Sequence, residues 1–332
     1  MKRWNKSYTG FGLFCLSFFI CFAGSAMAAD PKYPTKPIEF IITMAPGGTM
    51  DISCRALCEA ASKHLQQPII PINKPGAGGA LGASIIKDSK PDGYRIGILS
   101  RPAAFVIPFA EKVSYDPLTD FTPIIYFGDY VDILMVRGDS PWKTWKELIE
   151  WAKAHPGEIK VGMPGSKYMQ VQGIALGQIE LRENVKFTYI PFKGASETLT
   201  ALLGGNIDVY STTVDASTVD YLKIGKVRLL AFSGKIKLPG YESIPSTDEL
   251  YGISVCNFIG VVGPKGLPSY VAKTLIDAFQ RGIKDPSFVD VMQKMYTPIV
   301  GMTGEEVGKY IAKTYKEQKE IIERLKKEEA KK

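Results

Sequence analysis

The residues best suited to bind a ligand lie where predicted strands turn into predicted helices. The apolar run that begins at Ile38 ends in Ala45-Pro46-Gly47-Gly48, and a helical pattern starts at once. A helix start presents free backbone N–H groups and the positive end of the helix dipole, so this junction suits an anion. Gly47 and Gly48 allow a sharp turn and leave room for a ligand. An ordinary strand-to-helix turn is the alternative interpretation of this stretch.

The same arrangement of strand, small-residue loop and helix start recurs in the second half of the chain. It occurs at residues 163–168 and 192–196, and residues 212–217 are a further candidate. In open α/β sheets, ligands bind beyond the carboxyl ends of the strands, where such loops converge. Two domains that face each other with these loops would form a cleft for a small anion.

The sequence lacks the usual patterns of a catalytic or metal site. Its two histidines, His64 and His155, lie near predicted helix ends, where the dipole favours a cation. The glycine run after Lys74 lacks dinucleotide-binding spacing, because Leu81 stands where a third glycine is needed. The chain has no serine elbow and no metal-ligand spacing. We therefore predict a binding function with no catalytic residue, no metal and no cofactor.

The start of the chain has the layout of a cleavable signal peptide. Lys2, Arg3 and Lys6 precede an apolar run, and the small-residue site at 26–28 predicts cleavage after Ala28. Removing residues 1–28 leaves 304 residues and lowers the formal net charge from +7 to +4. This mildly basic balance, without a basic patch interleaved with aromatics, does not favour nucleic-acid binding.

Three cysteines remain after this cleavage: Cys54, Cys58 and Cys256. Cys54 and Cys58 follow helical spacing together with neighbouring apolar residues, so we expect both in the core. An odd number of cysteines, two of them separated by one helical turn, does not form a disulfide framework.

Predicted strands and helices alternate along the chain, which favours two α/β domains with open, mostly parallel sheets flanked by helices. Two β-rich runs between Phe121 and Arg137 follow one another without a helix, as expected of a strand that crosses between domains. A second crossing strand is expected at 256–262. We therefore predict domain 1 from residues 29–130 and 254–332, and domain 2 from residues 131–253.

A final helix is predicted to start at the capping box Thr303-x-x-Glu306. The Lys-rich tail from Lys316 onward also contains several glutamates. A mixed-charge run of this kind is typical of a solvated helix end.

Several segments together resemble the solute-binding proteins of tripartite tricarboxylate transporters, the Bug family. The N-terminal set is the more specific, and the match covers nearly all of the chain after the leader. The matching segments are Tyr33-Pro34-x-Lys36-Pro37-Ile38, Ala45-Pro46-Gly47-Gly48-x-x-Asp51, Asn73-Lys74-Pro75-Gly76-Ala77-Gly78-Gly79, Pro91-Asp92-Gly93-Tyr94, Ile190-Pro191-Phe192-Lys193-Gly194, Leu203-Gly204-Gly205-x-Ile207-Asp208, Ile244-Pro245-Ser246-Thr247-x-Glu249 and Gly263-Pro264-Lys265-Gly266-x-Pro268.

The resemblance implies a periplasmic binding protein with a two-domain, type II-like fold joined by two crossover strands. It would capture a small organic carboxylate and deliver it to the membrane permease subunits of a tripartite tricarboxylate transporter. We expect a monomer that binds no nucleic acid. Carried over by motif, the ligand-binding residues are Pro46, Gly47, Gly48, Thr49 and Asp51 in domain 1, and Ser166, Lys167, Gly194, Ala195 and Ser196 in domain 2.

Two departures from the family pattern leave the identity of the carboxylate open. Lys167 and Tyr168 stand in a run that is usually rich in serine and glycine, and Ala195 replaces the second glycine after Lys193. Asp51 has two interpretations, because it either complements the helix dipole or meets a ligand amine or hydroxyl. Two other functions stay open at this point: a sensory protein that presents its ligand to a receptor kinase, and an exported enzyme that acts on organic acids.

Overall fold

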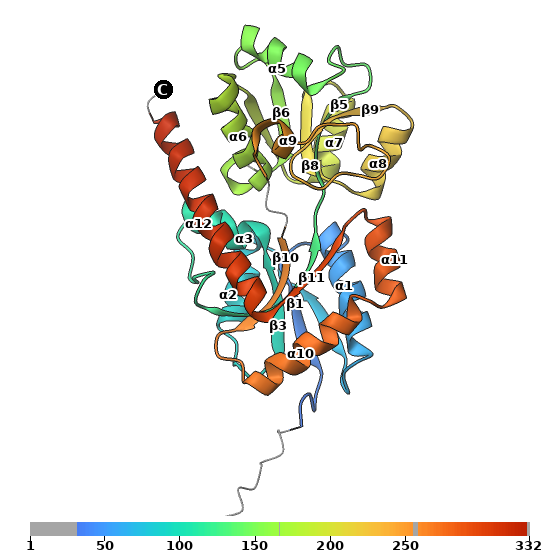
Figure 1. Ribbon diagram of the computed structural model, residues 1–332, viewed down its shortest axis with the longest axis vertical. Coiled ribbons are helices and arrows are strands. Elements are labelled where there is room, and N and C mark those ends of the chain that lie inside the picture. Colours follow the sequence, from blue (N-terminus) through green and yellow to red (C-terminus); the bar gives the residue numbers. More distant parts are fainter. Residues whose placement is uncertain (1–31, 166, 255–257, 331–332) are drawn as a thin grey trace, which may run out of the picture. The chain divides into compact units, whose positions relative to one another are not determined.

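The computed structural model describes residues 32–165, 167–254 and 258–330. Residues Tyr33–Lys332 form one compact unit that contains two β-sheets (Figure 1). The predicted signal peptide, Ser166 and Cys256 lie outside the described residues. The domain boundaries at 130 and 253 stay predictions.

The first sheet has six strands in the order β11-β4-β10-β3-β1-β2. The strands are β1 (Ile38–Ile42), β2 (Ile69–Asn73), β3 (Arg95–Ser100), β4 (Phe121–Asp129), β10 (Phe258–Pro264) and β11 (Ile299–Thr303). The helices of this part are α1 (Thr49–Ser62), α2 (Ala80–Lys87) after the 3-10 turn η1 (Ala77–Gly79), α3 (Arg101–Phe105), α4 (Ile107–Ala110), α10 (Ser269–Gly282), α11 (Pro286–Lys294) and α12 (Gly304–Glu329).

The second sheet has five strands in the order β7-β6-β8-β5-β9. The strands are β5 (Asp132–Arg137), β6 (Lys160–Pro164), β7 (Thr188–Phe192), β8 (Val209–Thr213) and β9 (Val227–Phe232). They are accompanied by α5 (Trp145–Ala154), the 3-10 turn η2 (Lys167–Met169), α6 (Val171–Glu183), α7 (Ala195–Leu203), α8 (Ala216–Lys223) and α9 (Thr247–Tyr251).

Each sheet combines a parallel part with antiparallel strands. Strand β1 is parallel to β2 and β3, and β6 is parallel to β7 and β8. Strand β10 is antiparallel to both β3 and β4, and β5 is antiparallel to both β8 and β9. Strands that are connected through helices therefore run parallel to each other. Strands β5 and β10 carry the chain from one sheet into the other, and each runs antiparallel to its neighbours.

The carboxyl edges of the two sheets are joined by a very short link. Strand β4 ends at Asp129, on the edge where β1 and β3 also end, because β4 and β3 both run antiparallel to β10. Strand β5 begins at Asp132, level with Thr213, the last residue of β8. Only Tyr130 and Val131 therefore separate the edge of the first sheet from the edge where the parallel strands of the second sheet end.

The apolar positions of the strands and helices form the expected cores. Cys54 and Cys58 of α1 are buried, free of disulfides, and packed with residues of β1 and α10. The core-packing prediction is confirmed for these two residues. Burial raises the pKa of both thiols, so neither is a reactive thiolate.

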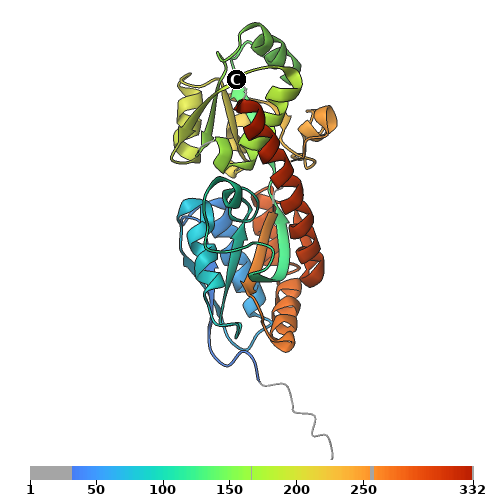
Figure 2. The same cartoon turned by 90° about the vertical axis from the view of Figure 1, so that its left-hand side faces the viewer.

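The final helix α12 begins where predicted, but its cap and its tail differ from the prediction. Thr303 makes no side-chain cap, and its hydroxyl accepts a hydrogen bond from Gln280 at 3.3 Å, so the capping box is wrong. The tail is amphipathic rather than fully solvated. Ile322 and Leu325 are 3% and 2% exposed and belong to the core of the second sheet, where Leu325 lies against Gly177 of α6. Figure 2 shows α12 as one long red helix.

Four short elements were not predicted. They are α3, α4, α9 and β11, each of four or five residues. The three helices each carry less than two turns of helical periodicity. Among the described residues, no helix combines the length and the apolarity that crossing a membrane requires.

Candidate ligand-binding site

The loop Ala45–Gly48 joins β1 to α1 and is exposed. Gly47 has φ +81°, in the left-handed region that favours glycine. Gly48 is the N-cap of α1 and, lacking a side chain, leaves the helix start without a side-chain cap. The backbone N–H groups of residues 48–51 therefore have no partner within the helix, as required of an anion site.

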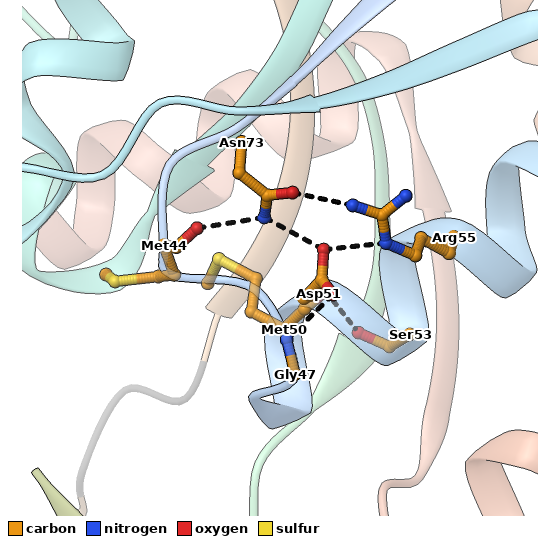
Figure 3. Close-up of polar contacts among 7 residues, drawn as sticks. All are labelled: Met44, Gly47, Met50, Asp51, Ser53, Arg55 and Asn73. Carbon is orange, nitrogen blue, oxygen red and sulfur yellow. Dashed lines mark hydrogen bonds and ion pairs between the residues drawn. The ribbon is translucent and has the colours of Figure 1, made fainter.

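A polar cluster behind this loop fixes its shape (Figure 3). One oxygen of Asp51 accepts the backbone N–H of Gly47 at 2.9 Å, and the other accepts Arg55 Nε at 2.9 Å and Asn73 Nδ2 at 2.8 Å. Asn73, at the end of β2, also donates to the carbonyl of Met44 and accepts from Arg55. The cluster thus ties the loop, the first turns of α1 and the neighbouring strand together.

These contacts favour a bracing role for Asp51. Burial opposes its ionisation, but the hydrogen bonds from Arg55, Gly47 and Asn73 outweigh this effect and hold the pKa of Asp51 below its usual range. Both carboxylate oxygens face donors of the protein, and the Gly47 N–H is already engaged. Of the five residues predicted in this loop, Gly48 and Thr49 therefore present the most accessible backbone donors.

The second predicted loop has the same construction at the start of α7. Gly194 is the N-cap, its backbone is extended, and α7 also lacks a side-chain cap. Ala195 and Ser196 follow as exposed residues of the first turn. The Glu197 carboxylate accepts the backbone N–H of Lys193 at 3.0 Å.

Both helix starts therefore combine a glycine N-cap with an acidic third residue that reaches back to the N–H of the residue before the cap. Asp51 does this in α1, and Glu197 does it in α7. The start of α8 is different, because the side chain of its N-cap, Asp215, accepts from the backbone N–H of Thr218 at 2.7 Å. The candidate loop at 212–217 is thus filled by a carboxylate of the protein itself, whereas α1 and α7 keep their N–H groups open.

Ser166 and Lys167 complete the predicted set. Ser166 lies outside the described residues. Lys167 begins η2, and its Nζ lies 2.8 Å from an oxygen of Glu180 and 4.7 Å from the ring centre of Tyr189. The ammonium of Lys167 is therefore neutralised within its own part of the molecule.

The structure brings together two residues that sequence reasoning missed. Arg101 directly follows β3, the strand next to β1 in the first sheet, and is the first residue of α3. Its Nη1 lies 2.7 Å from Oδ2 of Asp132, the first residue of β5. The side chains are 6% and 0% exposed, so this buried ion pair links the carboxyl edges of the two sheets. A lone Arg and a lone Asp, 31 residues apart, carry no sequence signal for such a pair.

In the described parts of the chain, no group of three or more His, Cys, Asp or Glu side chains is arranged to hold a metal ion. His155 follows the last residue of α5, as predicted, where its ring stacks on Trp151. The two open helix starts offer backbone N–H donors to an anion.

Comparisons with known proteins agree with this architecture. The model of the family described as "Tripartite tricarboxylate transporter family receptor" matches residues 53–327. The UPF0065 protein in the gbd 5' region of Cupriavidus necator is 36% identical over 301 residues, which covers 90% of this chain and 90% of that protein.

Solved structures show the same fold. A TctC solute binding protein from Polaromonas is 30% identical with a TM-score of 0.74, over 88% of this chain and all of that one (100%). The periplasmic binding protein BugD is 25% identical with a TM-score of 0.74, over 88% of this chain and 98% of BugD. The predicted two-domain binding-protein fold and the predicted family are both confirmed, and the chain belongs to the tripartite tricarboxylate transporter receptor family.

Proposed function

We propose that this protein captures a small organic carboxylate in the periplasm and delivers it to the permease subunits of a tripartite tricarboxylate transporter. One observation carries the proposal: the N-cap of both α1 and α7 is a glycine, so neither helix start has a side-chain cap. Pro46, Gly47, Gly48, Thr49 and Asp51 would form one side of the site. Ser166, Lys167, Gly194, Ala195 and Ser196 would form the other, with Asp51 and Lys167 acting through their protein partners.

The energetics of this arrangement suffice for transport-type binding. Hydrogen bonds to a charged group contribute about 1.5–3 kcal/mol each. Three or four of them from the two helix starts would support a Kd of about 1 μM, which requires about 8 kcal/mol, after the costs of ordering are met. This mode of binding needs no catalytic residue, so we propose a receptor rather than an enzyme.

The proposal is tested by placing a carboxylate of the protein in each open helix start. Gly48→Asp and Gly194→Asp both have room, since a Cβ at either position would meet no atom closer than 3.9 Å. An N-cap aspartate accepts the first-turn N–H groups, as Asp215 does in α8, and its charge repels a ligand carboxylate. We expect each variant to fold with unchanged or slightly higher stability and to bind organic acids at least about 100-fold more weakly.

The measurement is isothermal titration calorimetry after a thermal-shift screen of di- and tricarboxylates, aromatic acids and amino acids. Thr303→Asp is the matched control, because it introduces the same residue at the uncapped start of α12. Full affinity in both glycine variants would show that the anion binds elsewhere. If no organic anion stabilises the natural protein, the proposed function is wrong.

Two measurements separate the other functions from this one. An exported enzyme would convert its ligand, so unchanged ligand after long incubation with the purified protein supports a receptor. A sensory protein would be retained by a receptor kinase rather than by transporter subunits, which a pull-down with the periplasmic parts of each would show.

A further inference from the structure

The ion pair between Arg101 and Asp132 links the first sheet to the second. Arg101 directly follows β3, which lies next to β1, so it lies at the edge of the first sheet from which the chain continues into α1. Asp132 of β5 and Thr213 of β8 are paired at the edge of the second sheet. Strand β8 is next to β6, and β6 is next to β7. The pair is therefore on the same sheet edges as the starts of α1 and α7.

The carboxylate of Asp132 is fully engaged by its neighbours. Oδ2 accepts Arg101 Nη1 at 2.7 Å, and Oδ1 accepts Thr213 Oγ1 at 2.6 Å and Gln172 Nε2 at 3.1 Å. An ionised carboxylate can only accept hydrogen bonds, so it fixes which end of the Gln172 amide faces it. The amide oxygen Oε1 must therefore face away from Asp132.

This orientation leaves the Gln172 amide oxygen without a donor at the edge of the second sheet. Gln172 is 6% exposed, and its buried Oε1 has no hydrogen-bond donor among the residues that the structure describes. The same holds for Oδ1 of Asp129, the last residue of β4. Buried acceptors that lack a donor cost free energy, and a donor supplied by a ligand removes that cost.

The charges at this edge do not favour a second ligand carboxylate. Arg101 lies within electrostatic reach of two carboxylates, Asp129 and Asp132. The single positive charge of Arg101 therefore faces two groups of the protein that can carry a negative charge. Lys167, the cation in the predicted site, is paired with Glu180.

We propose that Gln172, held by the Arg101–Asp132 pair, is a specificity-determining residue of the ligand site, and that the site selects acids with one carboxylate and one hydrogen-bond donor group. The donor would be an amide, a hydroxyl or an amine, and the carboxylate would bind at the open helix starts. This inference rests on the proposed function and narrows its ligand class.

The test on the natural protein compares acids of matched length by isothermal titration calorimetry. One series is succinate, succinamate, γ-hydroxybutyrate and γ-aminobutyrate, and the same four end groups are compared on shorter and longer chains. We expect a donor-bearing acid to bind at least about tenfold more tightly than the dicarboxylate of the same length, as one hydrogen bond to a buried acceptor predicts. Equal or tighter binding of the dicarboxylates at every length overturns the inference and leaves the proposed function intact. If no acid of any series binds, both fail.

A matched pair of variants tests the role of Gln172 itself. Gln172→Met removes the acceptor at nearly constant volume, and we expect the preference for donor-bearing acids to fall below about threefold while dicarboxylate binding persists. Gln178→Met makes the same change farther along α6 and should keep the full preference. An unchanged preference in Gln172→Met would assign the discrimination to another residue. Should this variant not fold, the comparison on the natural protein still decides the ligand class.

Discussion

Small differences at single positions decide which helix start is open to a ligand. Helices α1 and α8 both follow a strand of a parallel set, but α1 has Gly48 at its N-cap and α8 has Asp215. A glycine leaves the first-turn N–H groups unpaired, whereas an aspartate satisfies one and adds a negative charge. The acidic residue of α1, Asp51, instead reaches back to Gly47 and shapes the loop without blocking the helix start.

At the same scale, Asp129 predicts a pH dependence of stability. Burial, opposed by a hydrogen bond from Tyr126 and by the Arg101 guanidinium, raises the pKa of Asp129 from 3.8 to about 6. Folding therefore favours its protonated form, so the unfolding free energy falls as the pH rises from about 4 to about 6 and this contribution is constant above. We expect Asp129→Asn to be more stable than the natural protein at pH 8, by at most about 3 kcal/mol, with the difference vanishing below pH 4.

Urea denaturation at a series of pH values measures this difference. Asp277→Asn, an exposed position on α10, is the control and should show no such pH-dependent gain. A difference for Asp129→Asn that is the same at pH 4 and pH 8 would contradict the assignment.

Among the elements, α12 makes core contacts that are not expected from its highly charged composition. Its 26 residues include many lysines and glutamates, yet Val307 and Ile311 pack in the core of the first sheet, and Ile322 and Leu325 in the core of the second. A helix of this length spans about 39 Å, at 1.5 Å per residue. One helix therefore contributes to both cores, in addition to the crossing strands.

We expect Leu325→Ala to lower the unfolding free energy by about 2–4 kcal/mol, because it removes a side chain that is 2% exposed and leaves a cavity beside Gly177. Chemical denaturation monitored by tryptophan fluorescence measures the loss. Leu118→Ala, at a position 44% exposed, should change the stability by less than about 1 kcal/mol. A loss as small in Leu325→Ala would mean that the end of α12 is not part of the core.

At the scale of the whole molecule, the described helices and strands all lie in the compact unit of residues 33–332. The signal peptide at residues 1–28 stays a prediction. The family membership and the layout of residues 1–28 together support export of this unit across the inner membrane.

We therefore expect the protein expressed with its full leader to be recovered from the periplasmic fraction with Ala29 as its first residue. Mass spectrometry of the purified protein identifies its N-terminal residue directly. Ala28→Arg should block cleavage by introducing a large cation at the processing site, while Ala29→Ser should be processed normally. A natural protein that keeps residues 1–28 would contradict the signal-peptide prediction.

The sequence by itself predicted the α/β class, the family, the burial of Cys54 and Cys58, and the glycine loops before α1 and α7. These features are local: they depend on periodicity, on turn residues and on ordered motifs, all of which lie within short stretches of chain. The capping box at Thr303 was wrong: its side chain makes no cap, and its hydroxyl accepts a hydrogen bond from Gln280, 23 residues away in sequence.

Only the tertiary structure decided which polar side chains meet at the proposed site. Gly47 and Asp51 are close in sequence, but Asn73 reaches them because β2 pairs with β1. The pair of Arg101 with Asp132 arises because β3 and β5 end and begin at edges joined by a two-residue link. Contacts of this kind depend on strand order and register, which no local pattern encodes, so only the folded chain shows which polar groups lie around the proposed site.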